Sequence, residues 1–176
     1  MAAYSNMPDG MEPGLEATHY FLAPRPTFAS GIHVAVVEID RDTGVVSIAD
    51  YAAVSDAGRL INPLIVEGQI HGGFAQGLGG ALYEELAYDV SGQPRTQTLL
   101  EYTMPSAEQV PPLKIANLVT PSPLNPLGVK GVGEGSACVA PPAIVNAVVD
   151  ALAPFGVTHV DMPLTAEKIW RAIQRR

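Results

Sequence analysis

Two apolar runs rich in β-branched residues predict a β-hairpin early in the chain. Ile32–Ile39 and Val45–Val54 are joined by Asp40–Gly44, whose Asp, Thr and Gly residues favour a turn. Residues 1–30 contain four prolines and show no regular apolar spacing. The sequence therefore predicts an irregular N-terminal segment over residues 1–30 and one folded unit over residues 31–176.

Apolar positions between residues 64 and 86 recur at the spacing of a helix, and no proline interrupts them. Five of them fall four residues apart, on one helix face: Ile70, Phe74, Leu78, Leu82 and Leu86. Six glycines lie in the same stretch, and each costs about 1 kcal/mol relative to Ala inside a helix. Such a helix needs very close packing against a neighbour or a ligand, so we expect it to be buried.

Short strands are expected in the middle of the chain. Two of them, near Tyr88 and over Gln97–Tyr102, flank a Ser-Gly turn, and a third covers Leu113–Val119. Six prolines fall between residues 105 and 126, which favours an extended, ordered path across a surface.

Two further helices are expected in the C-terminal part of the chain. The first runs from about Val139 to Leu152, with Pro141 and Pro142 in its first turn. The second covers Ala166–Gln174 and is capped by Thr165. Paired strands with helices packed on one side are typical of an α+β fold, here built from β-hairpins and short strands with packed helices.

Composition and charge exclude several classes of function. With 176 residues and 47% hydrophobic residues, the chain can form one domain with a core. A net charge of −8 and a pI near 4.8 argue against a nucleic-acid partner. No uncharged apolar run reaches 18 residues, and the N-terminus lacks the basic and apolar parts of an export signal. We therefore expect a cytoplasmic protein without a membrane partner.

The run Gly128–Gly135 carries the strongest chemical signal. It has four glycines and one carboxylate, Glu134, and a helix is predicted to follow it. A bare loop with one acid at a helix N-terminus suits an anionic cofactor and a proton transfer at the same place. A glycine-rich surface turn is the alternative. The run is neither a P-loop nor a dinucleotide fingerprint, because no Gly-Lys-Ser/Thr ends it and no buried strand precedes it.

Other polar residues give weaker signals. Small residues around Gln69 leave space for a fused-ring heterocycle whose edge its amide could bind, although a solvated helix residue is the alternative. We expect His71 to be structural, because the four histidines lack the spacing of metal ligands. The adjacent Glu84 and Glu85 point to different helix faces, which favours solvent or local contacts. Cys138 has no basic neighbour in the sequence, and we expect it to be a small buried packing residue.

Five motifs in a fixed order resemble a known family. They are Asp56–Pro63, Val66–Gly73, Ala75–Glu85, Tyr102–Pro105 and Gly128–Glu134. Together they resemble the C-terminal part of the molybdopterin-binding large subunit of the xanthine dehydrogenase, aldehyde oxidase and carbon monoxide dehydrogenase family. The resemblance extends from about residue 14 to residue 173 and implies that this fold is the C-terminal portion of a molybdenum-cofactor-binding domain.

The resemblance also implies roles for individual residues. Glu134 is expected to sit beside the molybdenum and to act as the general base. Gln69 is expected to hydrogen-bond the molybdopterin. The loop expected to lie against the cofactor comprises Lys130, Gly131, Val132 and Gly133. In the family the pterin dithiolene holds the metal, so we expect no side chain of this chain to be a metal ligand.

The cofactor and partners follow from the same resemblance. The cofactor is expected to be molybdopterin with molybdenum, and its cytosine dinucleotide form is an alternative. This chain is expected to share the cofactor with the upstream part of the large subunit. The expected partners are the remainder of the large subunit, iron–sulfur and FAD subunits or domains, and a small substrate such as an aldehyde or an N-heterocycle. This chain itself is expected to hold neither an iron–sulfur cluster, which needs four thiolates, nor a flavin. Family large subunits are several times longer, so we expect either an expressed fragment or a split subunit, inactive alone.

Two other interpretations stay open. The chain could be a non-catalytic assembly or cofactor-delivery module of the same fold, or an unrelated glycine-rich binding domain. The presence of both Glu134 and Gln69 argues against the delivery module, because neither residue would be needed there. Reconstitution with the missing part of the subunit would distinguish the interpretations, because restored activity supports the catalytic one.

Overall fold

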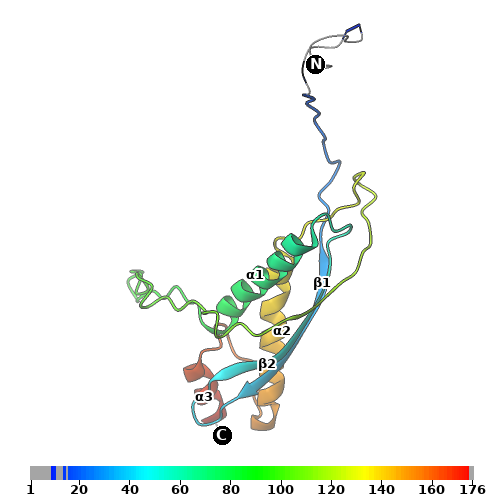
Figure 1. The fold of residues 1–176 in the computed structure, drawn as a ribbon. Helices are drawn as coiled ribbons and strands as arrows, with labels where there is room; N and C mark the ends of the chain where they lie inside the picture. Colours follow the sequence, from blue (N-terminus) through cyan, green and yellow to red (C-terminus); the bar gives the residue numbers. More distant parts are fainter. Residues whose placement is uncertain (1–8, 11–13, 15, 175–176) are drawn as a thin grey trace.

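The computed structural model describes residues 9–10, 14 and 16–174 of the chain. The fold is α+β, as predicted, with two long helices against one face of a small sheet (Figure 1). No helix or strand precedes Ser30 in the described residues, and the rest of the expected irregular segment lies outside them. The elements follow in the order β1 (Ser30–Ile39), β2 (Val46–Asp56), α1 (Pro63–Leu82), β3 (Lys114–Asn117), α2 (Gly135–Leu152), a 3₁₀ turn (Ala153–Phe155) and α3 (Ala166–Gln174).

β1 and β2 form the predicted antiparallel hairpin, in which Ser30 lies opposite Asp56 and the turn covers Asp40–Gly44. In the turn, the Asp40 carboxylate accepts hydrogen bonds from two backbone N–H groups (2.8 and 3.2 Å). Gly44 has a φ of 75°, and a Cβ there would clash with the backbone of α3. The turn therefore needs glycine both for its conformation and for its contact with the last helix.

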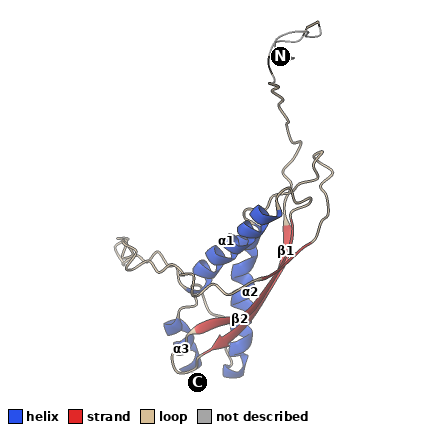
Figure 2. Cartoon of the chain, in the orientation of Figure 1, coloured by secondary structure: helices blue, strands red, loops and turns tan. Residues whose placement is uncertain are grey.

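The predicted run Leu113–Val119 contains β3, which pairs with β2 in parallel and gives the strand order β1-β2-β3. The other two predicted strands are wrong. Tyr88 forms only an isolated bridge, and residues 98–102 of the second predicted strand form turns and bends (Figure 2). Side chains in this region bond to the nearby backbone instead, since Glu101 accepts from the N–H three residues earlier (2.8 Å), which competes with strand pairing.

α1 begins at the pair Asn62 and Pro63. Asn62 Oδ1 accepts from two N–H groups of the first turn (3.1 and 3.4 Å), and Pro63 takes a first-turn position that needs no N–H partner. The helix ends at Leu82, earlier than predicted, where the next two backbone N–H groups both bond to Gly79 O (2.9 and 2.8 Å). Leu86 lies outside the helix and is exposed.

Glycines let α1 approach α2 closely, which confirms the close packing predicted for this helix. A Cβ on Gly73 would lie 2.8 Å from Ser136 Cβ, and a Cβ on Gly77 would lie 2.7 Å from Ala140 Cβ. Neither position can take a side chain unless the two helices separate. The helix is not buried all round, however, because three of its glycines have nothing within 4 Å of an added Cβ: Gly68, Gly72 and Gly80.

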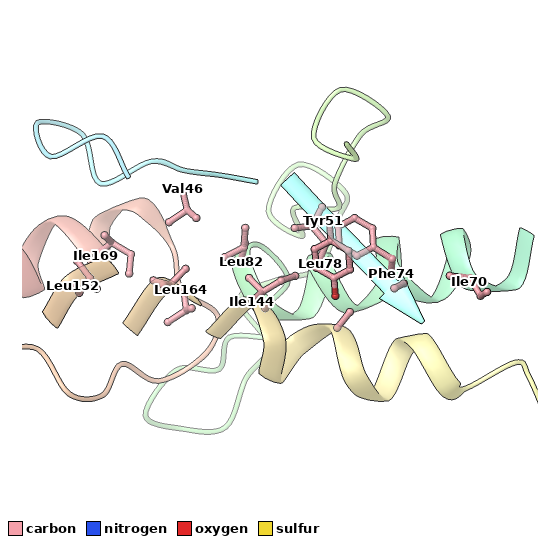
Figure 3. Close-up of a cluster of buried hydrophobic side chains, with 14 of the residues drawn as sticks. Val46, Tyr51, Ile70, Phe74, Leu78, Leu82, Ile144, Leu152, Leu164 and Ile169 are labelled. Carbon is pink, nitrogen blue, oxygen red and sulfur yellow. The ribbon is translucent and has the colours of Figure 1, made fainter. Parts of the chain in front are cut away.

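The core lies between the sheet and the helices (Figure 3). Tyr51 of β2 packs on Phe74 of α1 with ring centroids 4.3 Å apart. Four of the five apolar positions predicted for the buried face of α1 are at most 3% exposed: Ile70, Phe74, Leu78 and Leu82. Toward the C-terminus, Leu164 and Ile169 continue the same cluster. Burial of each such side chain contributes about 1.5–3 kcal/mol to folding.

α2 begins at Gly135, four residues before the predicted Val139. Pro141 and Pro142 therefore lie in its second turn and not in its first. Each proline leaves the carbonyl four residues earlier without its helical N–H partner. The helix nevertheless continues through this point, and Pro141 packs closely on α1, since a Cβ built on Gly77 would lie 2.9 Å from its Cδ.

The segment Gly135–Phe155 is long and apolar enough to cross a membrane, with a mean hydropathy of 1.5. The core helix of a globular protein has the same properties, and α2 presents a fully buried stripe to this core: Ala140, Ile144, Val148 and Leu152. Asp150 lies on its exposed side and interrupts the apolar run. The position of the helix is therefore that of a core element.

α3 covers the predicted range, and Thr165 caps it by accepting a hydrogen bond from the N–H of Lys168 (3.4 Å). Its inner face contributes Ile169 to the core. On the outer face, Arg171 pairs with Glu167 one turn earlier (2.5 Å). This short helix therefore closes the end of the fold where the hairpin turn lies.

Candidate functional site

Glu134 stands between the glycine loop (residues 128–133) and α2, where it is the N-cap residue. It is exposed and its side chain makes no capping hydrogen bond. Among the residues that the structure describes, none forms a hydrogen bond or ion pair with its carboxylate. Backbone N–H groups without helical partners lie beside it, so this place can hold an anion and accept a proton.

The glycine loop divides into an anchored part and a free part. Lys130 N–H donates to Ala57 O (2.9 Å), and Gly131 N–H donates to Thr27 O (2.8 Å). No residue in the described part of the chain accepts from the two N–H groups that follow. Of the loop residues predicted to lie against a cofactor, two therefore keep a free N–H: Val132 and Gly133.

The side chain of Lys130 points into the fold. Its Nζ donates to Asp56 Oδ2 (2.9 Å) and to Thr120 Oγ1 (2.6 Å), and the Thr120 hydroxyl in turn donates to Asp56. Only 17% of the Lys130 side chain and 9% of the Asp56 side chain are exposed. The Thr120 hydroxyl, and after it the Lys130 ammonium, hold the pKa of the Asp56 carboxyl well below its usual range. The cofactor contact predicted for Lys130 stays a prediction.

Sequence reasoning missed the two partners of this lysine. Asp56 begins one of the five motifs, but nothing in that motif names its partner, and Thr120 lies in the Pro-rich path. They meet because β2 and β3 are parallel neighbours that end at the same edge of the sheet, beside the glycine loop. Gly58 was missed as well. It has a φ of 67°, and a Cβ there would clash with Gly128 O, so the approach of the loop depends on it.

α1 brings Gln69 beside the glycine loop. A Cβ built on Gly133 would lie 3.3 Å from Gln69 Nε2, although 64 residues separate the two in the sequence. The Gln69 side chain is exposed, and its amide can donate two hydrogen bonds and accept through its oxygen. The fold therefore brings Gln69 against Gly133, the residue before Glu134, while the roles of Gln69 and Glu134 stay predictions.

A cavity of about 600 Å³ lies against Glu134 and the start of α2. Its walls come from residues 26–31, from the strands through His33 and Ser55, and from residues 131–136, 138 and 139. None of the described residues that line it is Lys or Arg. Apart from Glu134 and His33, the described lining residues carry no ionisable side chain except that of Cys138, so the cavity suits an uncharged small molecule, and an anionic group would have to meet the N–H groups of residues 132 and 133.

Cys138 lines this cavity and is exposed, so the buried packing role predicted for it is wrong. The error follows from the predicted start of the helix. Because α2 already begins at Gly135, Cys138 falls in its first turn on the outer face, while Ser136 and Ala140 take the buried positions.

The remaining candidates have local partners. His71 hydrogen-bonds Glu67 O through Nδ1 (3.0 Å), in keeping with a structural role. The Glu84 carboxylate accepts from the Tyr102 hydroxyl (2.6 Å), which raises the pKa of that tyrosine. His33 bonds the buried Tyr51 hydroxyl through Nδ1 (2.8 Å), and burial lowers its pKa. Within the described residues, no three His, Cys, Asp or Glu side chains are grouped so that they could hold a metal ion.

Two curated relatives match nearly the whole chain. The chain is 43% identical over 172 residues to the carbon monoxide dehydrogenase large chain of Hydrogenophaga pseudoflava. It is 46% identical over 175 residues to the nicotine 6-hydroxylase large subunit of Paenarthrobacter nicotinovorans. Both alignments cover 98% of this chain and 21% of the relative. The chain therefore spans about a fifth of the length of the curated relatives it matches.

Solved structures show the same fold. The crystal structure of the Cu,Mo-CO dehydrogenase in its carbon monoxide reduced state matches with a TM-score of 0.91 and 37% identity, over 97% of this chain and 22% of that one. Quinoline 2-oxidoreductase from Pseudomonas putida 86 matches with a TM-score of 0.80 and 50% identity, over 82% of this chain and 18% of that one.

A family model described as the molybdopterin cofactor-binding domain matches residues 1–111. The glycine loop lies beyond this range, but the alignments with the two large subunits cover nearly the whole chain. The resemblance carried by the five motifs is therefore confirmed. The chain belongs to the molybdopterin cofactor-binding domain family, in the branch that forms large subunits of molybdenum-containing oxidoreductases.

Proposed function

We propose that this chain forms the part of a molybdenum hydroxylase large subunit that carries the general base Glu134 and one side of the molybdopterin site. The reaction would be the hydroxylation of an aldehyde, an N-heterocycle or a similar small molecule. The observation that carries the proposal is the position of Glu134. Its carboxylate, with which no described residue pairs, stands at the N-terminus of α2, next to the N–H groups of residues 132 and 133 and directly after Gly133, which the Gln69 amide approaches.

The residues present fit a cofactor of this class. Gly68 and Gly72 leave the backbone of α1 open near Gln69, since nothing lies within 4 Å of an added Cβ at either position. A flat ring system can therefore approach the helix closely, with its edge against the Gln69 amide. The free N–H groups of Val132 and Gly133 are suited to an anionic oxygen of the same ligand.

The bound cofactor would supply the two-electron redox chemistry. The residues of this chain would do the remaining work. Gln69 would hold and orient the ring edge, and the free N–H groups of the glycine loop would fix its anionic end. Glu134 would take up a proton from the attacking nucleophile at one carboxylate oxygen, and no described lysine or arginine pairs with that carboxylate to compete for this role.

The printed names of two relatives support the substrate class. One is a nicotine 6-hydroxylase and another a quinoline 2-oxidoreductase, so both act on nitrogen heterocycles. The cavity beside Glu134, without Lys or Arg among its described lining residues, agrees with a neutral substrate. Carbon monoxide dehydrogenase chains match equally well along the chain, so carbon monoxide belongs among the substrates to be tested.

The proposal extends to partners and cofactor form. Because the chain spans about a fifth of its curated relatives, we propose that it works with the remainder of a large subunit and with iron–sulfur and FAD subunits or domains, in the cytoplasm. The cofactor is proposed to be molybdopterin with molybdenum, in its plain or its cytosine dinucleotide form. Detection of CMP after acid hydrolysis of the assembled enzyme would distinguish these two forms.

The substitution Glu134→Gln in the assembled enzyme tests the role of the base. The amide keeps the size of the side chain but cannot accept the proton, so turnover should fall by about 10²–10⁴-fold while molybdenum and pterin contents stay near those of the parent. Glu85→Gln, which changes an exposed acid away from the glycine loop, is the matched control and should leave turnover unchanged. A Glu134→Gln enzyme that keeps more than about a tenth of the parent turnover would remove Glu134 from the mechanism.

A further inference from the structure

A charged cluster ties the glycine loop to the sheet, and its members come from three separate places in the sequence. Asp56 ends β2, Thr120 follows β3, and Lys130 belongs to the loop itself. Lys130 Nζ donates to Asp56 Oδ2 (2.9 Å) and to Thr120 Oγ1 (2.6 Å), while Asp56 Oδ1 also accepts from the N–H of Gly58 (2.8 Å). The side chains of Lys130 and Asp56 are 17% and 9% exposed, while Thr120 lies at the exposed edge of the cluster, and each member bonds to the other two.

The cluster controls a part of the chain that has little conformational restraint of its own. Gly131 and Gly133 carry no side chains, so the peptide between them can adopt many conformations. The backbone is fixed on one side by the bonds of Lys130 and Gly131 and on the other by α2, where Cys138 N–H bonds to Glu134 O (3.0 Å). Only two residues, 132 and 133, lie between these fixed points.

The direction of the Glu134 carboxylate and of the two free N–H groups therefore depends on where Lys130 is held. A loop free to move by 1 Å would misplace the base relative to a bound substrate, and a displacement of this size can cost about a hundredfold in rate. A buried ion pair is also weak support for stability as such, because the cost of desolvating two charges offsets most of their attraction.

We propose that Lys130 is a positioning residue for Glu134, held in place by Asp56 and Thr120. This inference rests on the proposed function, in which Glu134 is the base. It assigns the Lys130 ammonium to the protein scaffold and not to the cofactor. The exposed pair Lys114 and Asp50 offers a matched control, because Asp50 lies on the same strand as Asp56 while the pair is open to solvent.

Hydrogen exchange on the chain itself tests the anchoring without any activity. Lys130→Met should speed the exchange of the backbone N–H groups of residues 130 and 131 by about tenfold or more, while those of β1 and β2 stay protected. Thr120→Val keeps both charges and should show a smaller change in the same direction, and Thr120→Ser should restore the parent rates. Lys114→Met should leave the loop unchanged. Unchanged loop exchange in both Lys130→Met and Thr120→Val would overturn the proposal.

Kinetics of the assembled enzyme test the positioning. Lys130→Met should lower kcat by about a hundredfold with KM and pterin content unchanged, and Thr120→Ser should keep the activity that Thr120→Val loses. In a Glu134→Gln background, Lys130→Met should cause no further loss. A Lys130→Met enzyme could instead lose pterin while the molecules that keep it show a normal kcat. This result would make Lys130 a cofactor ligand and overturn the proposal.

The two proposals fail in different ways. If Glu134→Gln keeps its activity, the proposed base is wrong, whatever Lys130→Met does. If Glu134→Gln is inactive while Lys130→Met turns over normally, the base stands and the positioning role is overturned.

Discussion

Asp56 is the acceptor at the centre of the cluster behind the glycine loop. Both of its oxygens are used, by the N–H of Gly58, the Thr120 hydroxyl and the Lys130 ammonium. Removing one partner of a buried pair leaves the other charge unpaired, which costs about 3–5 kcal/mol. The exposed pair of Lys114 with Asp50 should contribute much less, because water screens it.

The free energy of unfolding should therefore depend on pH through Asp56. Its pKa in the folded chain lies below the usual 3.8, so its contribution is complete above that value and is lost as the pH falls through it toward the folded pKa. Urea unfolding at several pH values from about 7 down to about 2 measures this. Asp56→Asn should be less stable than the parent at pH 7 and should lose this acid component.

His33 provides the control for that measurement. Burial lowers its pKa, so its protonation in the unfolded chain reduces stability as the pH falls below its usual 6.5, well above the range of Asp56. His33→Gln should remove the loss of stability that begins near pH 6.5 and leave the loss at lower pH that comes from Asp56. An Asp56→Asn chain whose stability falls as steeply as that of the parent below about pH 4 would contradict the assignment.

At the scale of elements, the two faces of α1 carry glycines in opposite surroundings, one closely packed and one open. On one face, Gly73 and Gly77 meet α2 so closely that an added Cβ would lie 2.7–2.9 Å from its atoms. On the other face, Gly68 and Gly72 meet nothing in this chain, although glycine weakens a helix. Packing within the described residues does not explain why glycine occupies the open face. Space for a ligand against the helix would explain it.

Alanine substitutions should separate the two faces. Gly77→Ala should destabilise the chain by about 1–3 kcal/mol, because the helices must part to admit the methyl group. Gly72→Ala should instead stabilise it by up to about 1 kcal/mol, through helix propensity. Thermal unfolding of the two variants measures the difference.

The assembled enzyme should give the opposite result for the open face. There, Gly72→Ala should lower pterin content, because its methyl group would occupy the space proposed for the cofactor. Normal pterin content in Gly72→Ala, together with higher stability, would show that no ligand lies against this face of α1.

The elements show what the sequence could reveal and what it could not. The hairpin, β3 and α3 were predicted because their spacing, turn residues and the Thr165 cap are local signals. The strand predicted over residues 97–102 failed because local hydrogen bonds to Glu101 outweigh the β propensity there. The start of α2 was missed because glycine and proline, both poor helix formers, occupy its first two turns.

The candidate site divides in the same way. Glu134 and Gln69 were found because their surroundings are unusually rich in glycine, which is visible in the sequence itself. Asp56 and Thr120 were not found, because their importance lies in their contacts with Lys130. These residues are 74 and 10 positions from Lys130 in the sequence, and only the packing of β2, β3 and the loop brings them together. Solvent exposure of Cys138 likewise follows from the helix start and not from its neighbours in the sequence.

At the scale of the whole molecule, the helices cover only one face of the sheet (Figure 1). The other face of β1 presents three large apolar side chains that are more than half exposed: Ile32, Val34 and Val36. A contiguous apolar strip on a strand favours association with other chains.

The isolated chain should therefore self-associate. Light scattering should show species larger than a monomer at high concentration, and Val34→Lys should shift them toward the monomer, because a charge in the strip opposes its burial. Glu38→Lys, on the same exposed side of β1 but without loss of apolar surface, should not have this effect. A strictly monomeric parent chain would contradict the prediction.

The separation of the site residues along the chain also sets the order in which the site can form during synthesis. The ion pair of Asp56 with Lys130 closes a loop of 74 residues, and 64 residues separate Gln69 from Gly133. The entropy of closing such loops makes these contacts late events, after the hairpin and α1 have formed from local contacts. A chain still on the ribosome, with Gln69 folded and Glu134 not yet made, has no site to offer. With the roles proposed for Gln69 and Glu134, cofactor insertion would therefore follow synthesis of the chain.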